Sequence, residues 1–171
     1  MKRKRIFLVI VSVLVLFLIG WRMWPHTFRT ITSSGEEVFH TISIFVCERG
    51  FSDGTPTMDF YQLKIESPKD EHYTTIVSML ENTDYRSDFR NMLPWKISSV
   101  GSGSDTITYS AIVDMTWGND DSCTLVFVGD RQVSLTDTRE NQTEIAVYHP
   151  TDRTTLDQIA AYTIEHGTLQ K

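Results

Sequence analysis

The sequence predicts an α+β fold: an antiparallel, meander-like sheet of about five to six strands with two helices packed on one face, preceded by one N-terminal transmembrane helix. Three observations lead to this prediction. Several stretches alternate apolar and polar residues and are joined by short turns, as antiparallel strands are. Two other stretches space their apolar residues as amphipathic helices do, and the N-terminal residues are first basic and then apolar.

Composition and length indicate one folded domain. The chain has 171 residues, of which 40% are hydrophobic and 22% are charged. These proportions are typical of a globular protein and unlike those of a disordered or collagen-like chain. The length suits one domain with an appendage, so a single core is expected.

The N-terminal residues are expected to form a signal-anchor, a transmembrane segment that is not cleaved. The basic residues Lys2 to Arg5 precede an apolar run from Ile6 to Ile19. Trp21 and Trp24 stand where aromatic rings settle at a membrane interface, and Arg22 can extend its charge to the headgroups. These three residues are therefore the expected membrane-interface anchors. The residues after the run are mostly large, unlike those of a signal-peptidase site.

The chain then divides into a signal-anchor over residues 1–25, a polar linker over residues 26–37 and an extracytoplasmic α+β domain over residues 38–171. Basic residues concentrate before the span, which places the N-terminus in the cytoplasm and the domain outside, in a single-pass protein of the cell membrane. If the anchor is cleaved instead, the domain is secreted.

Charge restricts the partners. Outside residues 1–25 the chain has 11 basic and 22 acidic residues, a formal charge of −11. This charge repels phosphate backbones, so nucleic acid is excluded as a partner, and cationic partners suit it better. The expected partners are the membrane, through the N-terminal span, and an unknown protein, wall polymer or small ligand. The alternative explanation is that an acidic surface simply keeps the domain soluble.

The first part of the domain predicts a hairpin and a helix. Residues 41–49 and 57–66 have strand composition and flank a turn that contains glycine and proline. Ser67 is expected to cap a helix that ends near Asn82. The apolar stripe of this helix consists of Tyr73, Ile76, Val77 and Leu80.

The second part predicts a meander and a final helix. Residues 85–93 lack a clear pattern and are assigned to no element, whereas residues 106–117 alternate cleanly. Further strands follow, each after a turn, over residues 122–128, 131–136 and 144–149. A last helix begins near Thr154 and stops at Gly167.

Cys47 and Cys123 are the two cysteines of the chain, and both fall in predicted strands. In an oxidising compartment they form a disulfide if the two strands are neighbours with suitable geometry. Such a bond would stabilise the fold by roughly 4 kcal/mol in the chain-entropy model. The alternative is two buried free thiols that pack as small apolar side chains.

No motif predicts catalytic, cofactor-binding or metal-binding residues, and none is assigned. The histidines fall in no zinc-binding spacing, and the cysteines form no Cys-x-x-Cys pair. Asn119-Asp120-Asp121 offers oxygen ligands to calcium but lacks the spacing of an EF-hand loop, which favours a hairpin turn.

Trp95 and Trp117 are the candidate partner-binding residues. Both lie near predicted turns, and tryptophan is enriched at interfaces. Core packing is the alternative for both, and it is favoured for Trp117, which continues the apolar face of its strand.

Three functions remain open. The leading hypothesis is a noncatalytic binding or interaction module, anchored in the membrane and placed outside the cytoplasm. The second is a small hydrolase-like enzyme with dispersed carboxylates and histidines, which requires His72, His149 or His166 to converge with Asp or Glu in a pocket. The third is an accessory subunit of a membrane complex, with the span as its interface.

Overall fold

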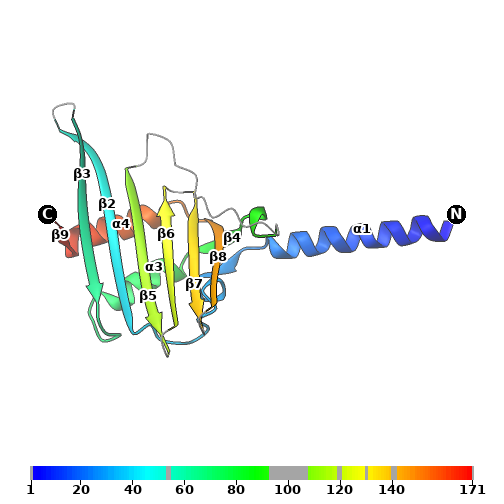
Figure 1. The fold of residues 1–171 in the computed structure, drawn as a ribbon, viewed down its shortest axis with the longest axis horizontal. Coiled ribbons are helices and arrows are strands. Elements are labelled where there is room, and N and C mark those ends of the chain that lie inside the picture. The colour runs from blue at the N-terminus through cyan, green and yellow to red at the C-terminus, as the bar shows by residue number, and fades with distance from the viewer. Residues whose placement is uncertain are drawn as a thin grey trace.

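The computed structural model describes residues 2–52, 55–92, 108–118, 121–129, 131–139 and 142–170. Within these residues nine strands form one antiparallel sheet. The strands are β1 (His26–Thr27), β2 (Thr41–Ser52), β3 (Thr55–Ile65), β4 (Asp84–Ser87), β5 (Tyr109–Trp117), β6 (Asp121–Val128), β7 (Val133–Arg139), β8 (Gln142–Pro150) and β9 (Thr168–Gln170). Their order across the sheet is β1-β4-β8-β7-β6-β5-β2-β3-β9 (Figure 1).

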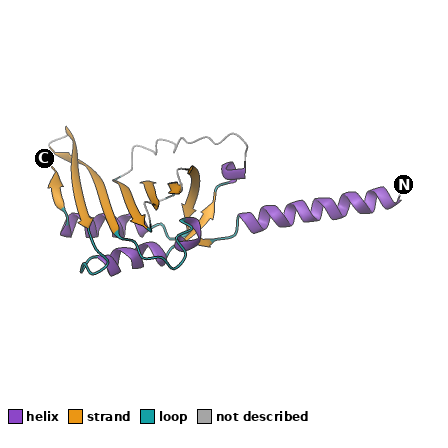
Figure 2. Cartoon of the chain, turned by 60° about the horizontal axis from the view of Figure 1, so that its bottom comes forward, coloured by secondary structure: helices purple, strands orange, loops and turns teal. Residues whose placement is uncertain are grey.

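Two of the helices cover one face of the sheet (Figure 2). The described helices are α1 (Lys2–Arg22), α2 (Phe28–Ile31), α3 (Tyr73–Glu81) and α4 (Thr155–His166), with a short 3-10 helix η1 (Phe89–Met92). Figure 2 shows α3 and α4 lying along the same face of the sheet. We call this face the helix side and the opposite one the open face.

The core lies between the sheet and the helix side. On β2 the side chains of Ile42, Ile44 and Val46 are buried, whereas Phe45 points to the open face and is 38% exposed. The buried residues of both helices belong to the same apolar cluster as those of β2. On α3 and α4 these are Ile76, Val77, Leu80, Leu156, Ile159 and Ala160. The alternate residues of the strands and the apolar stripes of the helices therefore pack together in one core.

The predicted sheet of five to six strands with two helices is wrong in both counts, because nine strands and four α-helices are described. The elements missing from the prediction are short: β1 has 2 residues, β4 has 4, β9 has 3 and α2 has 4. Elements of this length leave no readable period in the sequence. The antiparallel arrangement predicted for the strands is present.

The start of the first core helix also differs from the sequence prediction. α3 begins at Tyr73, and Ser67 does not cap it. The Ser67 hydroxyl instead accepts a hydrogen bond from the Lys69 backbone N–H at 3.1 Å. Ser67 thus forms a local turn, which is the alternative that serine offers to a helix cap.

Residues 26–37, expected to be a linker, carry folded structure. They contain β1, which pairs with β4, and α2, whose Phe28 and Ile31 are buried in the core. Thr27 caps α2, because its hydroxyl accepts a hydrogen bond from the Thr30 backbone N–H at 3.4 Å. The segment is mostly polar, and its two core residues are too few to show a period in the sequence.

The N-terminal helix α1 extends away from the sheet (Figure 1). In the part of the chain that the structure describes, no helix is both long enough and apolar enough to cross a membrane. This finding corrects the predicted transmembrane helix, the signal-anchor and the single-pass location in the cell membrane. The physical reason is length, since the apolar run from Ile6 to Ile19 is about 21 Å long as a helix, against about 30 Å of hydrocarbon.

Candidate functional site

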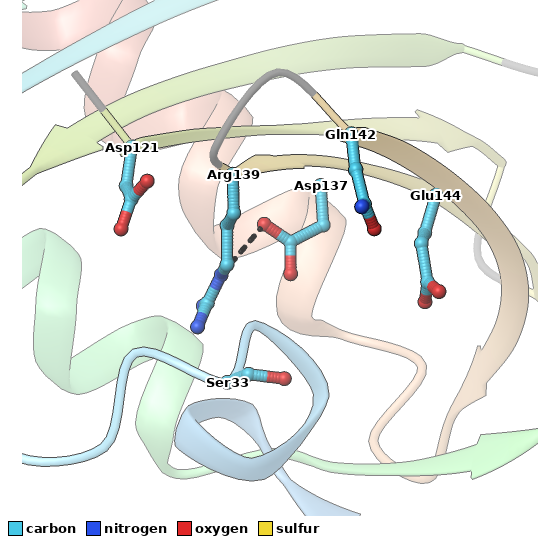
Figure 3. Close-up of a pocket in the computed structure, with 6 residues that line it drawn as sticks. All are labelled: Ser33, Asp121, Asp137, Arg139, Gln142 and Glu144. Carbon is cyan, nitrogen blue, oxygen red and sulfur yellow. Dashed lines mark hydrogen bonds and ion pairs between the residues drawn. The ribbon is translucent and has the colours of Figure 1, made fainter.

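A polar cavity of about 360 Å³ lies at one end of the helix side, where β6, β7 and β8 meet the loop that follows α2. We call it the carboxylate pocket. Its lining residues are Ser33, Asp121, Asp137, Arg139, Gln142 and Glu144. Figure 3 shows the strand side chains projecting from the sheet toward the loop that holds Ser33. The volume lies in the range of small-ligand sites.

The alternation of β7 explains why charged residues line a cavity on the helix side. Val133 and Leu135 are buried in the core, and Asp137 and Arg139 continue the same face of the strand. The register then places Asp137 opposite Glu144 of β8. The core face thus changes from apolar to charged toward this end of the strands.

Arg139 organises the pocket. Its Nε lies 3.3 Å from Asp137 Oδ1, and its Nη2 donates a hydrogen bond to the carbonyl oxygen of Thr32. Its guanidinium carbon lies 5.2 Å from the centroid of the Trp117 ring, a cation–π contact. A core tryptophan, a neighbouring carboxylate and the α2 loop therefore all restrain this cation.

Negative charge exceeds positive charge in the pocket, because three carboxylates face a single guanidinium. Burial raises the pKa of Asp137 above its ordinary value, and the charges of Asp121 and Glu144 raise it further. The neighbouring Arg139 lowers that pKa but does not outweigh these effects. A cation that entered the pocket would relieve this repulsion between carboxylates.

One lining residue, Ser33, and one residue near Asp121, Gly118, have left-handed backbone conformations. Ser33 has a φ of 48° and Gly118 a φ of 55°, both in the left-handed region. A Cβ placed on Gly118 would lie 3.6 Å from Glu37 Oε2 and 3.9 Å from Asp121 Oδ2. Glu37 therefore adds a fourth carboxylate near the side of the pocket that Asp121 forms.

The side chains of this site can accept hydrogen bonds from a positively charged group. Carboxylates and an amide oxygen accept hydrogen bonds from ammonium or guanidinium groups. Among the described residues, no three His, Cys, Asp or Glu side chains gather closely enough to hold a metal ion. These acceptor groups suit an organic cation that carries N–H donors.

The structure does not bring Cys47 and Cys123 together, and both thiols are free. Cys47 lies on β2 and Cys123 on β6, with β5 between these strands. Their side chains also point to opposite faces, because Cys47 shares the open face with Phe45, whereas Cys123 is buried in the core. Two strand spacings are about 9.6 Å, beyond the reach of a disulfide.

Of the two tryptophans predicted to bind partners, the structure describes only Trp117, and it is buried. Trp117 is 1% exposed and packs edge-on against Phe39, with ring centroids 5.5 Å apart. It contributes to the carboxylate pocket only as the surface under Arg139. Trp95 lies outside the described residues.

Of the residues predicted to anchor the chain at an interface, Trp21 and Arg22 end α1 and Trp24 follows it. Trp21 is 70% exposed and Trp24 is 71% exposed, and both line an apolar hollow of about 590 Å³ with Phe17. Arg22 is the last residue of α1.

The enzyme hypothesis required a histidine and a carboxylate to converge, and His149 and Asp88 do so. His149 Nε2 lies 2.8 Å from Asp88 Oδ2, and its Nδ1 lies 2.7 Å from the carbonyl oxygen of Arg131. Arg90 binds the same carboxylate through Nε at 2.9 Å and Nη2 at 2.8 Å. Hydrogen bonds from Arg90 hold the pKa of Asp88 well below its usual range. Every polar atom of this pair is thus engaged in holding structure together.

The other two histidines form an aromatic cluster between α3 and α4. His72 Nδ1 lies 2.9 Å from the Tyr162 hydroxyl, and the His72 and His166 ring centroids are 5.1 Å apart. Their carboxylate neighbours Glu71 and Glu165 are largely exposed at 3.6 and 3.8 Å. This cluster joins two helices and lines none of the described cavities.

Sequence reasoning missed most of the pocket. It noted the acidic turn that includes Asp121 but assigned residues 137–142 to a turn, although β7 continues to Arg139 and β8 begins at Gln142. The available signal was the alternation of Asp137 and Arg139, which continues that of Val133 and Leu135, with Glu144 following.

The chain matches no protein-family model, no curated protein and no solved structure with which it was compared.

Proposed function

We propose that this chain is a noncatalytic binding module and that the carboxylate pocket binds a cationic group, an amine or a guanidinium, of a protein or small ligand. The single observation that supports this function is the excess of carboxylates in a cavity of ligand size. The acidic balance of the chain, −6 in total, favours the same class of ligand by attracting cations over longer distances.

The arrangement favours binding over catalysis. A binding site needs fixed, complementary charge, and Arg139 is held by Asp137, the Thr32 carbonyl group and the Trp117 ring. A hydrolase needs a base that is free to take a proton. In the His149 and Asp88 pair both ring nitrogens and both carboxylate oxygens already have partners.

Calorimetric titration of the full-length chain tests the proposal. The probes are arginine methyl ester and 1,4-diaminobutane, with glycerol and citrate as neutral and anionic comparisons. Asp137→Asn and Glu144→Gln should each weaken binding of the cations about tenfold, because a hydrogen bond to a charged group contributes about 1.5–3 kcal/mol. Glu66→Gln is the matched control, since Glu66 is exposed and follows β3, far across the sheet from β8.

The proposal fails if the cations bind no better than glycerol. It also fails if Glu66→Gln weakens binding as much as Glu144→Gln does, because the effect would then come from overall charge.

A second candidate function is that of a subunit in a larger protein assembly, with α1 as the contact surface. This candidate is supported by the exposure of large apolar side chains along α1, for example 68% for Phe7 and 67% for Leu16. Replacing residues 6–24 by an unrelated apolar helix should abolish co-purification of crosslinked partners. Partners retained by that variant would rule this function out.

A further inference from the structure

The open face carries an apolar patch on β2, β3 and β5. It consists of Phe45, Phe51, Met58, Phe60 and Ile112, whose exposed fractions are 38%, 79%, 57%, 50% and 41%. Taking about 200 Å² for a large apolar side chain, the exposed surface is roughly 500 Å². Single exposed apolar residues need no explanation, whereas a contiguous patch of this size is as large as the largest patch of a typical monomer, and such patches are often functional.

The strand register makes the patch contiguous. Phe45 pairs with Ile112 of β5 on one side, and Phe60 pairs with Cys47, two residues further along β2. Paired residues point to the same face of a sheet, so these side chains are neighbours. The helix side is the other face, and α3 and α4 therefore do not cover the patch (Figure 2).

On β2, β3 and β5 the open face carries two cations and one carboxylate, an excess of positive charge that contrasts with the acidic chain. Arg49 of β2 pairs with Met58, and Lys64 of β3 pairs with Ser43, so both cations lie on the open face beside the patch. The nearest carboxylate on that face, Asp114 of β5, accepts a hydrogen bond from the Thr124 hydroxyl at 2.6 Å. This hydrogen bond satisfies one oxygen of Asp114 and leaves its charge in place, so two cations outnumber one carboxylate beside the patch.

We propose that this patch is a docking surface for an acidic segment of a partner protein, one that combines apolar side chains with Asp or Glu. Apolar side chains of the partner cover the patch, and its carboxylates meet Arg49 and Lys64. A second copy of this chain fits less well, because a symmetric contact would bring the excess positive charge of both copies into one interface. The surface lies on the opposite face from the carboxylate pocket and has the opposite charge, so the two proposals stand independently.

Two synthetic helical peptides serve as probes. They share one leucine stripe and differ in their flanking residues, which are glutamate in one and lysine in the other. Fluorescence anisotropy with the full-length chain should show the glutamate peptide binding at least about tenfold more tightly. Phe60→Ser and Arg49→Glu should each weaken that binding about tenfold, because Phe60 packs against the stripe and Arg49 meets a carboxylate.

Three controls make the result interpretable. Lys69→Glu changes charge as Arg49→Glu does, but at an exposed position in the loop before α3, and should leave affinity within about twofold. Asp137→Asn, which tests the carboxylate pocket, should leave peptide binding unchanged. Phe60 is half exposed, so Phe60→Ser is expected to fold, and circular dichroism checks this.

Equal affinity for the two peptides, or for wild type and Phe60→Ser, would overturn the proposal and assign the binding to another apolar surface such as α1. A concentration-dependent dimer in analytical ultracentrifugation that Phe60→Ser dissociates would also overturn it, because the occupant would then be a second copy.

Discussion

Replacement of Asp88 by asparagine is expected to lower the free energy of unfolding at pH 7 by about 2–3 kcal/mol. The side chain of Asp88 is 9% exposed and accepts hydrogen bonds from both the side chain and the backbone of Arg90. It also lies 2.8 Å from His149 Nε2. Asparagine is nearly isosteric, but it removes the charge and turns an N–H group toward these donors.

The magnitude follows from the exposure of the partners. Breaking a fully buried ion pair costs about 3–5 kcal/mol, because the remaining charge is left without a partner. The side chains of Arg90 and His149 are 26% and 43% exposed, so water replaces part of the lost interaction with the carboxylate. The lower figure of 2–3 kcal/mol corresponds to a fall of about 5–10 °C in the melting temperature for a chain of this size.

The effect should depend on pH with a definite sign. The pKa of Asp88 in the folded chain lies below its ordinary value of 3.8. The stability that Asp88 contributes is therefore fully present above pH 3.8 and is lost as the pH falls through the folded pKa. The difference between wild type and Asp88→Asn should narrow below about pH 4, as Asp88 becomes protonated.

Urea denaturation of both proteins at a series of pH values measures this difference. Asp59→Asn serves as the matched control, since Asp59 is an exposed aspartate on β3. A difference below about 0.5 kcal/mol at pH 7, or one that does not narrow in acid, would refute the assignment of Asp88 as a charge-dependent structural residue.

Three further substitutions test other parts of the structure. Asp137→Asn should stabilise the chain by about 0.5–1 kcal/mol at pH 7, because a raised pKa means that the charged form is disfavoured on folding. This gain should vanish in urea denaturation at acid pH, where Asp137 is protonated. Asn91→Ala should cost about 1–3 kcal/mol in thermal melts, since the Asn91 amide accepts from the Val147 N–H at 2.8 Å and donates to its carbonyl group at 2.6 Å. Gly167→Ala should cost about 1–3 kcal/mol in urea denaturation, because its Cβ would lie 2.5 Å from the carbonyl oxygen of Thr163. An unchanged midpoint for either of the last two variants would contradict the contact in question.

The long, amphipathic parts of the fold could be predicted from sequence. The spacing of Ile76, Val77 and Leu80 identifies the buried stripe of α3, and all three are buried. The alternation from Ala111 to Trp117 likewise identifies the core face of β5. In both cases the signal is the burial of one side of a regular element, which is a local property of the sequence.

The carboxylate pocket could not be predicted in the same way. Asp137 and Glu144 face each other only because β7 and β8 pair in one particular register, and polar strand ends have the composition of turns. The contribution of Ser33 depends on α2, whose 4 residues carry no period. To predict a site that is assembled by strand pairing, one must know the register, and the sequence specifies the register only indirectly.

The strand order also bears on how the chain acquires its structure. The meander from β5 to β8 joins neighbours that are adjacent in sequence, so its loops close at low entropic cost. By contrast, β2 must find β5 and β4 must find β8 over long stretches of chain, because Ile44 pairs with Val113 and Arg86 pairs with His149. Chains with many such distant contacts fold slowly. Until β2 arrives, the apolar edge of β5 is unprotected, and this interval is when the chain is most prone to associate with other copies of itself.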